Sequence, residues 1–482
     1  MVGMNDDFQL LSGRTFHPDE ANQAFTTGRL LETGRYEYRP DDHHGPTLYY
    51  AAAALQKASG RDAVAAMDGT LLRCTPLLFA VLALVFGFMS VRKLVKPATG
   101  ALGGWLAPCL CALLLGTAPI FVFFATDFIQ EMLLACFTLA MFWAGAGYTR
   151  PGKRWKPGTW ALLFGIAAGL AFATKETSLL AFAAAGLAGI PLAWRCRNDM
   201  RFEARDAMLA LSGFALTAIL LFSSFASNWQ GVYNAFVAAP LSYLGRAAGS
   251  ASSAGAADHV HPWWQYLKWL FFAGWRFSAL PLAALFIVTF RRRSFMHLYA
   301  IAILVLYSLI PYKTPWCALQ LLVPLAIAPF LAPWTRPRAL VAIPLVALSL
   351  AANAIGDAAI ARDPDSKDIP YNYASASPEV KQLAATVASA MDAAAGREQP
   401  FVAVALPPAD TWPFPWYNRP YEPQTGYWTS FDDLKRLAAG GVKPTVVIVP
   451  MTEGHLVQPL FPHLKNTKRF FMRPGVRVRV FW

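Results

Sequence analysis

Residues 74–95 decide the fold class, with the sequence CTPLLFAVLALVFGFMSVRKLV. The first 18 of these residues carry no charged side chain, and Arg92 and Lys93 follow near the end of the run. A helix that crosses a bilayer needs roughly 20 apolar residues. The stretch therefore predicts a transmembrane helix that ends in positive charge.

The same pattern recurs along the chain. Of the 482 residues 56% are hydrophobic and 15% are charged, whereas soluble domains carry roughly 25% charged residues. We therefore predict a mainly α fold, a polytopic transmembrane bundle of about ten helices. The expected spans are 74–95, 103–123, 128–148, 159–174, 177–194, 206–226, 269–290, 295–311, 315–333 and 338–356.

Basic residues gather in alternate loops, after the first, third, fifth, seventh and ninth of these runs. The five loops hold 16 Lys and Arg and three acids, which equals the net charge of +13 of the whole chain. The excess of basic residues in cytoplasmic loops orients membrane proteins, so we expect these loops in the cytoplasm. Topology thus accounts for the basic character, and nucleic acid is not expected as a partner.

The remaining loops are then expected on the outer face, and they define three predicted domains. Residues 1–73 form a first extracytoplasmic loop, 74–356 the transmembrane domain, and 357–482 a small extracytoplasmic α/β domain. In that last domain we expect helices at 378–395 and 431–439 and strands at 401–406, 445–449 and 476–481. Because the first 73 residues are polar, we expect a further helix before them in the natural chain; insertion with the N-terminus outside is the alternative.

Charged residues at membrane level mark functional sites by default. Topology places Asp19, Glu20, His43, His44, Asp127, Glu131, Lys175, Glu176 and Lys313 on the outer face, although they come from five parts of the chain. Asp127 and Glu131 are four residues apart, so on a helix they would share one face.

Each of these residues also has an ordinary structural interpretation. Pro18 and Asp19 are typical of a helix start, His43 and His44 of a surface or capping pair, Lys175 and Glu176 of a self-paired charge, and Lys313 of a snorkelling side chain.

Two kinds of chemistry suit carboxylates and cations gathered at a lipid–water boundary. A carboxylate can act as general base on an acceptor or hold a divalent cation, and Lys and His can bind a phosphate. These residues are suited to transfer of a group from a lipid-phosphate donor. An ion-coupled transporter is disfavoured, because its acidic residues would more often lie in the middle of broken helices.

Five motifs then carry a family resemblance. The stretch 16–21, FHPDEA, resembles the acidic motif in the first outer loop of the glycosyltransferase C superfamily. With HHGPTLYY at 43–50, FIQEMLL at 128–134, ATKET at 173–177 and PYKTPW at 311–316, the chain resembles the flippase-activity-associated family of archaeal protein glycosylation, related to protein O-mannosyltransferases and aminoarabinose transferases. The resemblance covers about residues 14–335.

The resemblance implies a polyprenyl-phosphate-linked sugar donor and an inverting transfer on the outer face of the cytoplasmic membrane, with membrane lipid and an extracytoplasmic acceptor as the other partners. Asp19 would be the base or its metal-bound equivalent, with Glu20 beside it, and Glu131 the second acidic position. Lys175 would bind the donor phosphate. The expected supporting residues are Glu176, His43, His44, Asp127 and Lys313.

A divalent cation, Mg²⁺ or Mn²⁺, would be held by Asp19 and Glu131. The alternative function is a flippase, or a non-catalytic accessory to one, for lipid-linked sugars.

Overall fold

A computed structural model describes residues 11, 13–40, 42, 44–95, 101–150, 155–196, 203–242, 259–272, 274–291, 294–332, 336–373, 375–396 and 399–482. The chain divides into two compact units. One comprises Thr33–Leu55 and Thr70–Tyr371, the helical unit. The other comprises Met1–Glu32, Gln56–Gly69 and Asn372–Trp482, the sheet unit. The stretch 1–73, expected to act as one loop, is thus shared between the two units.

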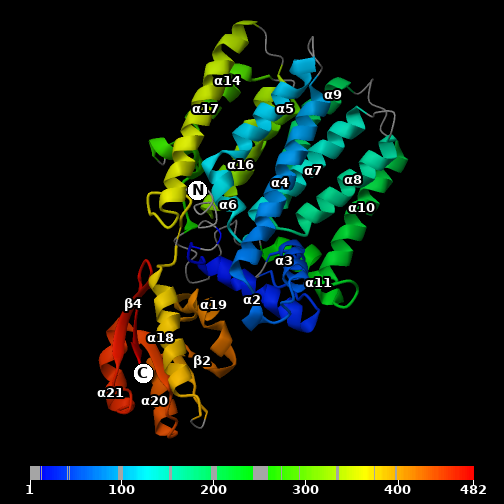
Figure 1. The fold of residues 1–482 in the computed structure, drawn as a ribbon. Coiled ribbons are helices and arrows are strands. Elements are labelled where there is room, and N and C mark those ends of the chain that lie inside the picture. The colour runs from blue at the N-terminus through cyan, green and yellow to red at the C-terminus, as the bar shows by residue number, and fades with distance from the viewer. Residues whose placement is uncertain are drawn as a thin grey trace. The chain divides into compact units, whose positions relative to one another are not determined.

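Every expected span contains a helix of the helical unit (Figure 1). The helices are α4 (Gly69–Leu94), α5 (Ala101–Gly116), α6 (Pro119–Ala125), α7 (Glu131–Thr149), α8 (Pro157–Phe172), α9 (Ser178–Cys196), α10 (Ala204–Phe222), α14 (Leu280–Thr289), α15 (Phe295–Leu309), α16 (Ala318–Ile327) and α17 (Arg336–Arg362).

Among the described residues, four helices are long and apolar enough to cross a membrane, namely α4, α7, α10 and α17. Helices α5 and α6 form a fifth candidate, bent by 67°. Pro119 opens α6, and its missing N–H cannot continue the hydrogen-bond ladder of α5. The helical membrane fold is confirmed, whereas the count of ten spans remains a prediction.

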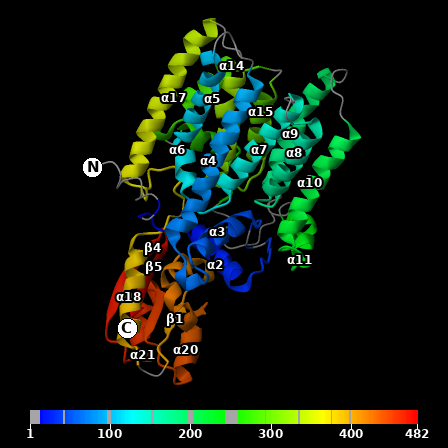
Figure 2. The same cartoon turned by 45° about the vertical axis from the view of Figure 1, so that its right-hand side comes forward.

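The burial of these helices separates a central helix from lipid-facing ones. Of the apolar window of α7, 72% is buried, against 22% for α10 and α17. Large apolar side chains lie exposed on the outer helices, such as Leu211 and Leu216 on α10 and Leu340 on α17. Soluble surfaces rarely present such continuous apolar patches. The chain is therefore an integral membrane protein, with α7 and α8 packed together and α10 against α8 (Figure 2).

The sheet unit contains α2 (Pro18–Thr33) and a five-stranded sheet in the order β2-β1-β3-β5-β4. The strands are β1 (Val402–Ala405), β2 (Thr425–Trp428), β3 (Val446–Pro450), β4 (Thr467–Arg473) and β5 (Val476–Phe481). β1 is parallel to β2 and β3, and β5 is antiparallel to β3 and β4.

Alternate residues of each central strand pack on opposite faces, as the period of two requires. Val402 and Val404 face α18 (Glu379–Ala393), whereas Ala403 and Ala405 face α20 (Phe431–Ala439) and α21 (Val457–Leu460). The predicted helices at 378–395 and 431–439 and the three predicted strands are present. The edge strands β2 and β4 were not predicted, since TGYW is short and contains the poor strand former Gly426, and TKRFFMR has Lys468 and Arg469 near its start.

Candidate functional site

Lys175 and Glu131 form a buried ion pair within the helical unit. They come from sequence positions 44 apart and are 6% and 1% exposed. Glu131 is the first residue of α7, where the helix dipole favours a negative charge. Lys175 lies in the turn that joins α8 to α9. The ammonium neutralises the carboxylate, which a buried charge requires.

Two residues of the segment 315–333 surround this pair. Gln320, on α16, donates a hydrogen bond of 3.0 Å from Nε2 to the backbone oxygen of Glu131. The Lys175 ammonium lies 5.8 Å from the ring centroid of Trp316, within reach of a cation–π interaction. Three segments far apart in sequence therefore hold one lysine in a fixed position.

The turn that carries Lys175 is held by the segment 44–47. The N–H groups of Gly45 and Thr47 donate to the backbone oxygens of Thr174 (3.1 Å) and Ala173 (3.2 Å). A Cβ at Gly45 would lie 2.2 Å from the Ala173 oxygen, so only glycine permits this approach. The glycine of the motif HHGP thus has a structural role. It lets the backbone approach this turn closely and so places the neighbouring His44 beside it.

A second charge cluster centres on Glu176. One carboxylate oxygen lies 2.8 Å from Nδ1 of His44, and the other accepts a hydrogen bond of 2.6 Å from the Tyr38 hydroxyl. Burial raises the pKa of this carboxyl, but His44 and Tyr38 outweigh it and hold the pKa at about 2. Tyr36 donates in turn to the backbone oxygen of His44 at 2.5 Å. Glu176 is thus a carboxylate held in place by the side chains of His44 and Tyr38, and Tyr36 holds the backbone of His44.

The expectation that Asp127 and Glu131 share one helix face is wrong. Helix α6 ends at Ala125 and α7 begins at Glu131, so Asp127 lies in the irregular turn that joins them. The Ile129 N–H donates to the Asp127 backbone oxygen at 2.7 Å, which tightens this turn. Asp127 is still buried, at 7% exposure, one turn before the ion pair.

Lys313 is buried in the turn after α15, where it bonds to backbone rather than to an acid. Its ammonium donates to the carbonyl of Ile310 and, at 3.4 Å, to that of His261. The Lys313 N–H donates to the His259 backbone oxygen at 2.9 Å. Lys313 therefore ties residues 259–261 to the turn 310–313. His43 lies outside the described residues.

Asp19 and Glu20 lie in the sheet unit, in the first turn of α2, and they differ sharply in burial. Glu20 is fully buried, accepts a hydrogen bond of 3.0 Å from the His17 N–H and lies 3.9 Å from Arg14. The Asp19 side chain is 49% exposed. Nδ1 of His17 accepts a hydrogen bond of 3.1 Å from the Asp19 N–H. Because this nitrogen acts as an acceptor, it has no proton to share with the Asp19 carboxylate, which lies 3.8 Å away. Glu20 orders the helix start, and Asp19 is the carboxylate open to a reactant.

The start of α2 is fixed within its own unit by the aromatic segment 412–417. The Phe16 N–H donates to the Tyr417 hydroxyl at 2.8 Å, and the Phe16 ring stacks on Trp416 at 4.8 Å. Trp416 and Phe414 are buried. This segment is therefore packed core next to the acidic motif.

Three buried polar residues were not predicted from the sequence. Tyr38 and Gln320 bond directly to the expected residues, and Arg73 on α4 is fully buried within the helical unit. Gln320 had a usable signal, because it is a lone polar residue in an apolar run. Arg73 immediately precedes the first expected span, and Tyr38 resembles an ordinary interfacial tyrosine.

The predicted metal site can be compared with the part of the chain that the structure describes. No three His, Cys, Asp or Glu side chains there lie close enough to bind one ion together. Glu131 is neutralised by Lys175, and Asp19 belongs to the other unit. A divalent cation held by Asp19 and Glu131 therefore stays a prediction, and we derive no step through one.

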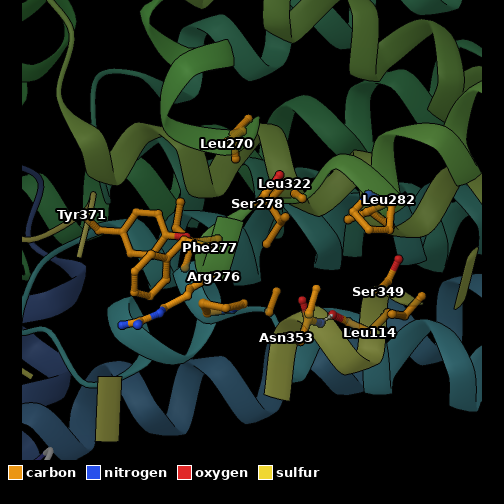
Figure 3. A pocket seen from close by; sticks show the side chains of 16 residues that line it. Leu114, Leu270, Arg276, Phe277, Ser278, Leu282, Leu322, Ser349, Asn353 and Tyr371 are labelled. Carbon is orange, nitrogen blue, oxygen red and sulfur yellow. Dashed lines mark hydrogen bonds between the residues drawn. The ribbon is translucent and has the colours of Figure 1, made fainter. Parts of the chain in front are cut away.

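A crevice near α17 is too small for a sugar. It has a volume of about 20 Å³ and a mostly apolar lining, to which Arg276, Ser349 and Asn353 add polar groups (Figure 3). Asn353 donates to the Leu114 backbone oxygen at 3.2 Å. A space of this size holds about one water, and none of the expected site residues lines it.

Comparison with solved structures identifies the fold. ArnT from Cupriavidus metallidurans bound to undecaprenyl phosphate matches with a TM-score of 0.64 and 15% identity, over 99% of this chain and 96% of that chain. The apo state of the same protein matches with a TM-score of 0.66 and 15% identity, over 100% and 96%. The apo oligosaccharyltransferase of Archaeoglobus fulgidus matches with a TM-score of 0.53 and 10% identity, over 93% and 68%.

These structures belong to the glycosyltransferase C superfamily, so the expected resemblance to that superfamily is confirmed at the level of the fold. The narrower likeness to the flippase-activity-associated family stays a prediction. No protein-family model matches the chain, and no curated protein matches it by sequence.

Proposed function

We propose that the chain is an integral-membrane glycosyltransferase that moves a sugar from a polyprenyl-phosphate-linked donor to an extracytoplasmic acceptor. The observation that carries the proposal is the buried Lys175–Glu131 pair, a cation fixed beside Trp316 in a helical membrane unit. Buried charges in such units mark functional sites. The fold is shared with a protein solved with undecaprenyl phosphate, which supports a donor of this class.

In this proposal Lys175 binds the donor phosphate through charge-assisted hydrogen bonds. Asp19, the half-exposed carboxylate, takes the proton of the acceptor as the acceptor attacks the anomeric carbon from the face opposite the phosphate. The bond from sugar to phosphate breaks, and the lipid phosphate leaves with the electron pair. Such a single displacement inverts the anomeric centre and needs one base.

The proposal also sets the location and the supporting groups. The chain resides in the cytoplasmic membrane with the basic loops inside, so that Lys175 and the sheet unit face outward. His44 and Tyr38 fix Glu176 next to Lys175 in the sequence and keep the turn rigid. A requirement for Mg²⁺ or Mn²⁺ remains a prediction, tested by chelation followed by addition of each ion.

The deciding experiment is a transfer assay with purified full chain, a polyprenyl-phosphate sugar and membrane acceptors. We expect Asp19→Asn to lower transfer by roughly two to four orders of magnitude, the usual contribution of a general base. Asp62→Asn, at an exposed acid of the same unit, is the matched control and should transfer normally. Transfer that survives Asp19→Asn removes Asp19 as base. Translocation of the sugar lipid without any transfer would favour the flippase alternative.

A further inference from the structure

A large apolar groove lies within the helical unit, and none of the predicted site residues lines it. Its volume is about 1000 Å³, and its walls come from α7, α8, α9, α10 and α15. Although α9 follows α8 in the chain, it packs on α15 and barely touches α8. The groove follows α9 from Leu179 to Ala193. Its length along a helix and its apolar lining suit a hydrocarbon chain.

Glycines keep the groove open. A Cβ built at Gly145, Gly186 or Gly189 meets nothing within 4 Å. By contrast, a Cβ at Gly165, which also lines the groove, would clash with Ala210 of α10. The first three glycines therefore do not serve close helix packing. They leave space, at a cost in helix propensity of up to about 1 kcal/mol each.

One end of the groove is positively charged. Arg150 follows α7 and Arg291 follows α14, both line the groove, and both are exposed. Thr149 and Ser294 add hydroxyls, and no acid among the described residues lines the groove. Nη1 of Arg150 donates to Leu94 O at 2.5 Å. Arg291 has no hydrogen-bond acceptor or acidic partner among the described residues. An apolar slot that ends in two arginines is complementary to a lipid with an anionic headgroup.

We propose that this groove binds an anionic glycerophospholipid, with its phosphate at Arg150 and Arg291 and an acyl chain along the glycine face of α9. The polyprenyl-phosphate donor is the competing occupant. It is disfavoured because Arg150 and Glu131 lie at opposite ends of the 19-residue α7, about 28 Å apart along its axis. The headgroup end is therefore remote from Lys175, where the donor phosphate is proposed to bind.

The test measures lipid binding to the purified full chain by native mass spectrometry. Phosphatidylglycerol, phosphatidylcholine with the same acyl chains, and polyprenyl phosphate are titrated separately. We expect phosphatidylglycerol to bind at least about tenfold more tightly than phosphatidylcholine, the value of one charge-assisted hydrogen bond. Arg291→Gln should remove about tenfold of that affinity. Arg205→Gln, on exposed α10 surface outside the groove, is the matched control and should change nothing.

A second variant tests the groove without touching charge. Gly186→Leu should fill it and lower phosphatidylglycerol binding at least tenfold, while Gly104→Leu, where a Cβ also meets open space but outside the groove, should not. Circular dichroism confirms that each variant is folded. Binding unchanged in both Arg291→Gln and Gly186→Leu would overturn the site. Arg291-dependent binding of polyprenyl phosphate that displaces phosphatidylglycerol would overturn the assigned occupant.

Discussion

Replacing Lys175 by Met tests whether the buried pair serves structure, donor binding or both. Lys175 and Glu131 are 6% and 1% exposed, so Lys175→Met leaves a carboxylate buried without its cation. Breaking a buried pair in this way costs about 3–5 kcal/mol. Glu131→Gln should be costly for the same reason, because it strands the ammonium. In the double variant Glu131→Gln/Lys175→Met neither charge is left, so we expect most of the lost stability to return.

The measurement is a double-mutant cycle on the helical unit. Unfolding by denaturant in detergent is followed through thiol labelling of Cys136, which is fully buried on α7, with the other cysteines replaced. We expect a coupling free energy of about 2 kcal/mol or more. The exposed pair Glu37 and Arg39, 3.7 Å apart in the same unit, is the control cycle. A coupling free energy no larger than that of the control pair would refute the buried-pair reasoning.

The same four proteins separate stability from function. If Lys175 binds the donor phosphate, the double variant regains stability but not transfer, because Met cannot hydrogen-bond to phosphate. If the double variant regains transfer together with stability, the charge of Lys175 is dispensable to the donor. That result would remove Lys175 from the proposed mechanism. The ion pair between Lys175 and Glu131 would then have a structural role only.

Three further outcomes are expected. Stability should fall as the pH drops from about 4.5 to about 2, because the folded-state pKa of Glu176 lies near 2 and protonation favours the unfolded chain. In acid denaturation, His44→Gln should make this dependence of stability on pH less steep. An unchanged slope contradicts the role of His44. Leu383→Ala, fully buried under the sheet on α18, should cost about 2–5 kcal/mol in thermal unfolding, whereas a cost near zero would disprove that packing. Ser366→Cys should label from outside intact cells and Arg205→Cys only after permeabilisation; the reverse pattern overturns the orientation.

The fold was largely predictable because hydropathy and charge act over whole segments. A long apolar segment such as 74–95 has few alternatives to a helix, since a bilayer leaves no backbone polar group unpaired. The bend between α5 and α6 and the shortness of α14 and α16 were not predicted, because backbone groups at membrane depth can be satisfied by neighbouring protein. Pro119 was a visible sign of the bend.

Charge distribution grouped several site residues correctly but did not predict their partners. Charge distribution selected Glu131, Lys175, His44 and Glu176 as one group, and in the helical unit they form two ion pairs. It did not reveal that Glu131 pairs with Lys175, or that Tyr38 completes the contacts of Glu176. Those choices depend on side-chain distances of a few tenths of an ångström, set by turns such as the one that Gly45 permits.

The contrast between Asp19 and Glu20 shows how two adjacent carboxylates acquire different roles. Helix geometry turns successive side chains by about 100°, so when Pro18 begins α2 one acid faces the interior and the other faces solvent. Glu20 takes the buried direction and satisfies the His17 N–H. Asp19 is left exposed beside it. An acid committed to a helix start cannot also exchange protons with an acceptor, so of the pair only Asp19 is free to act as the base that the proposed transfer needs.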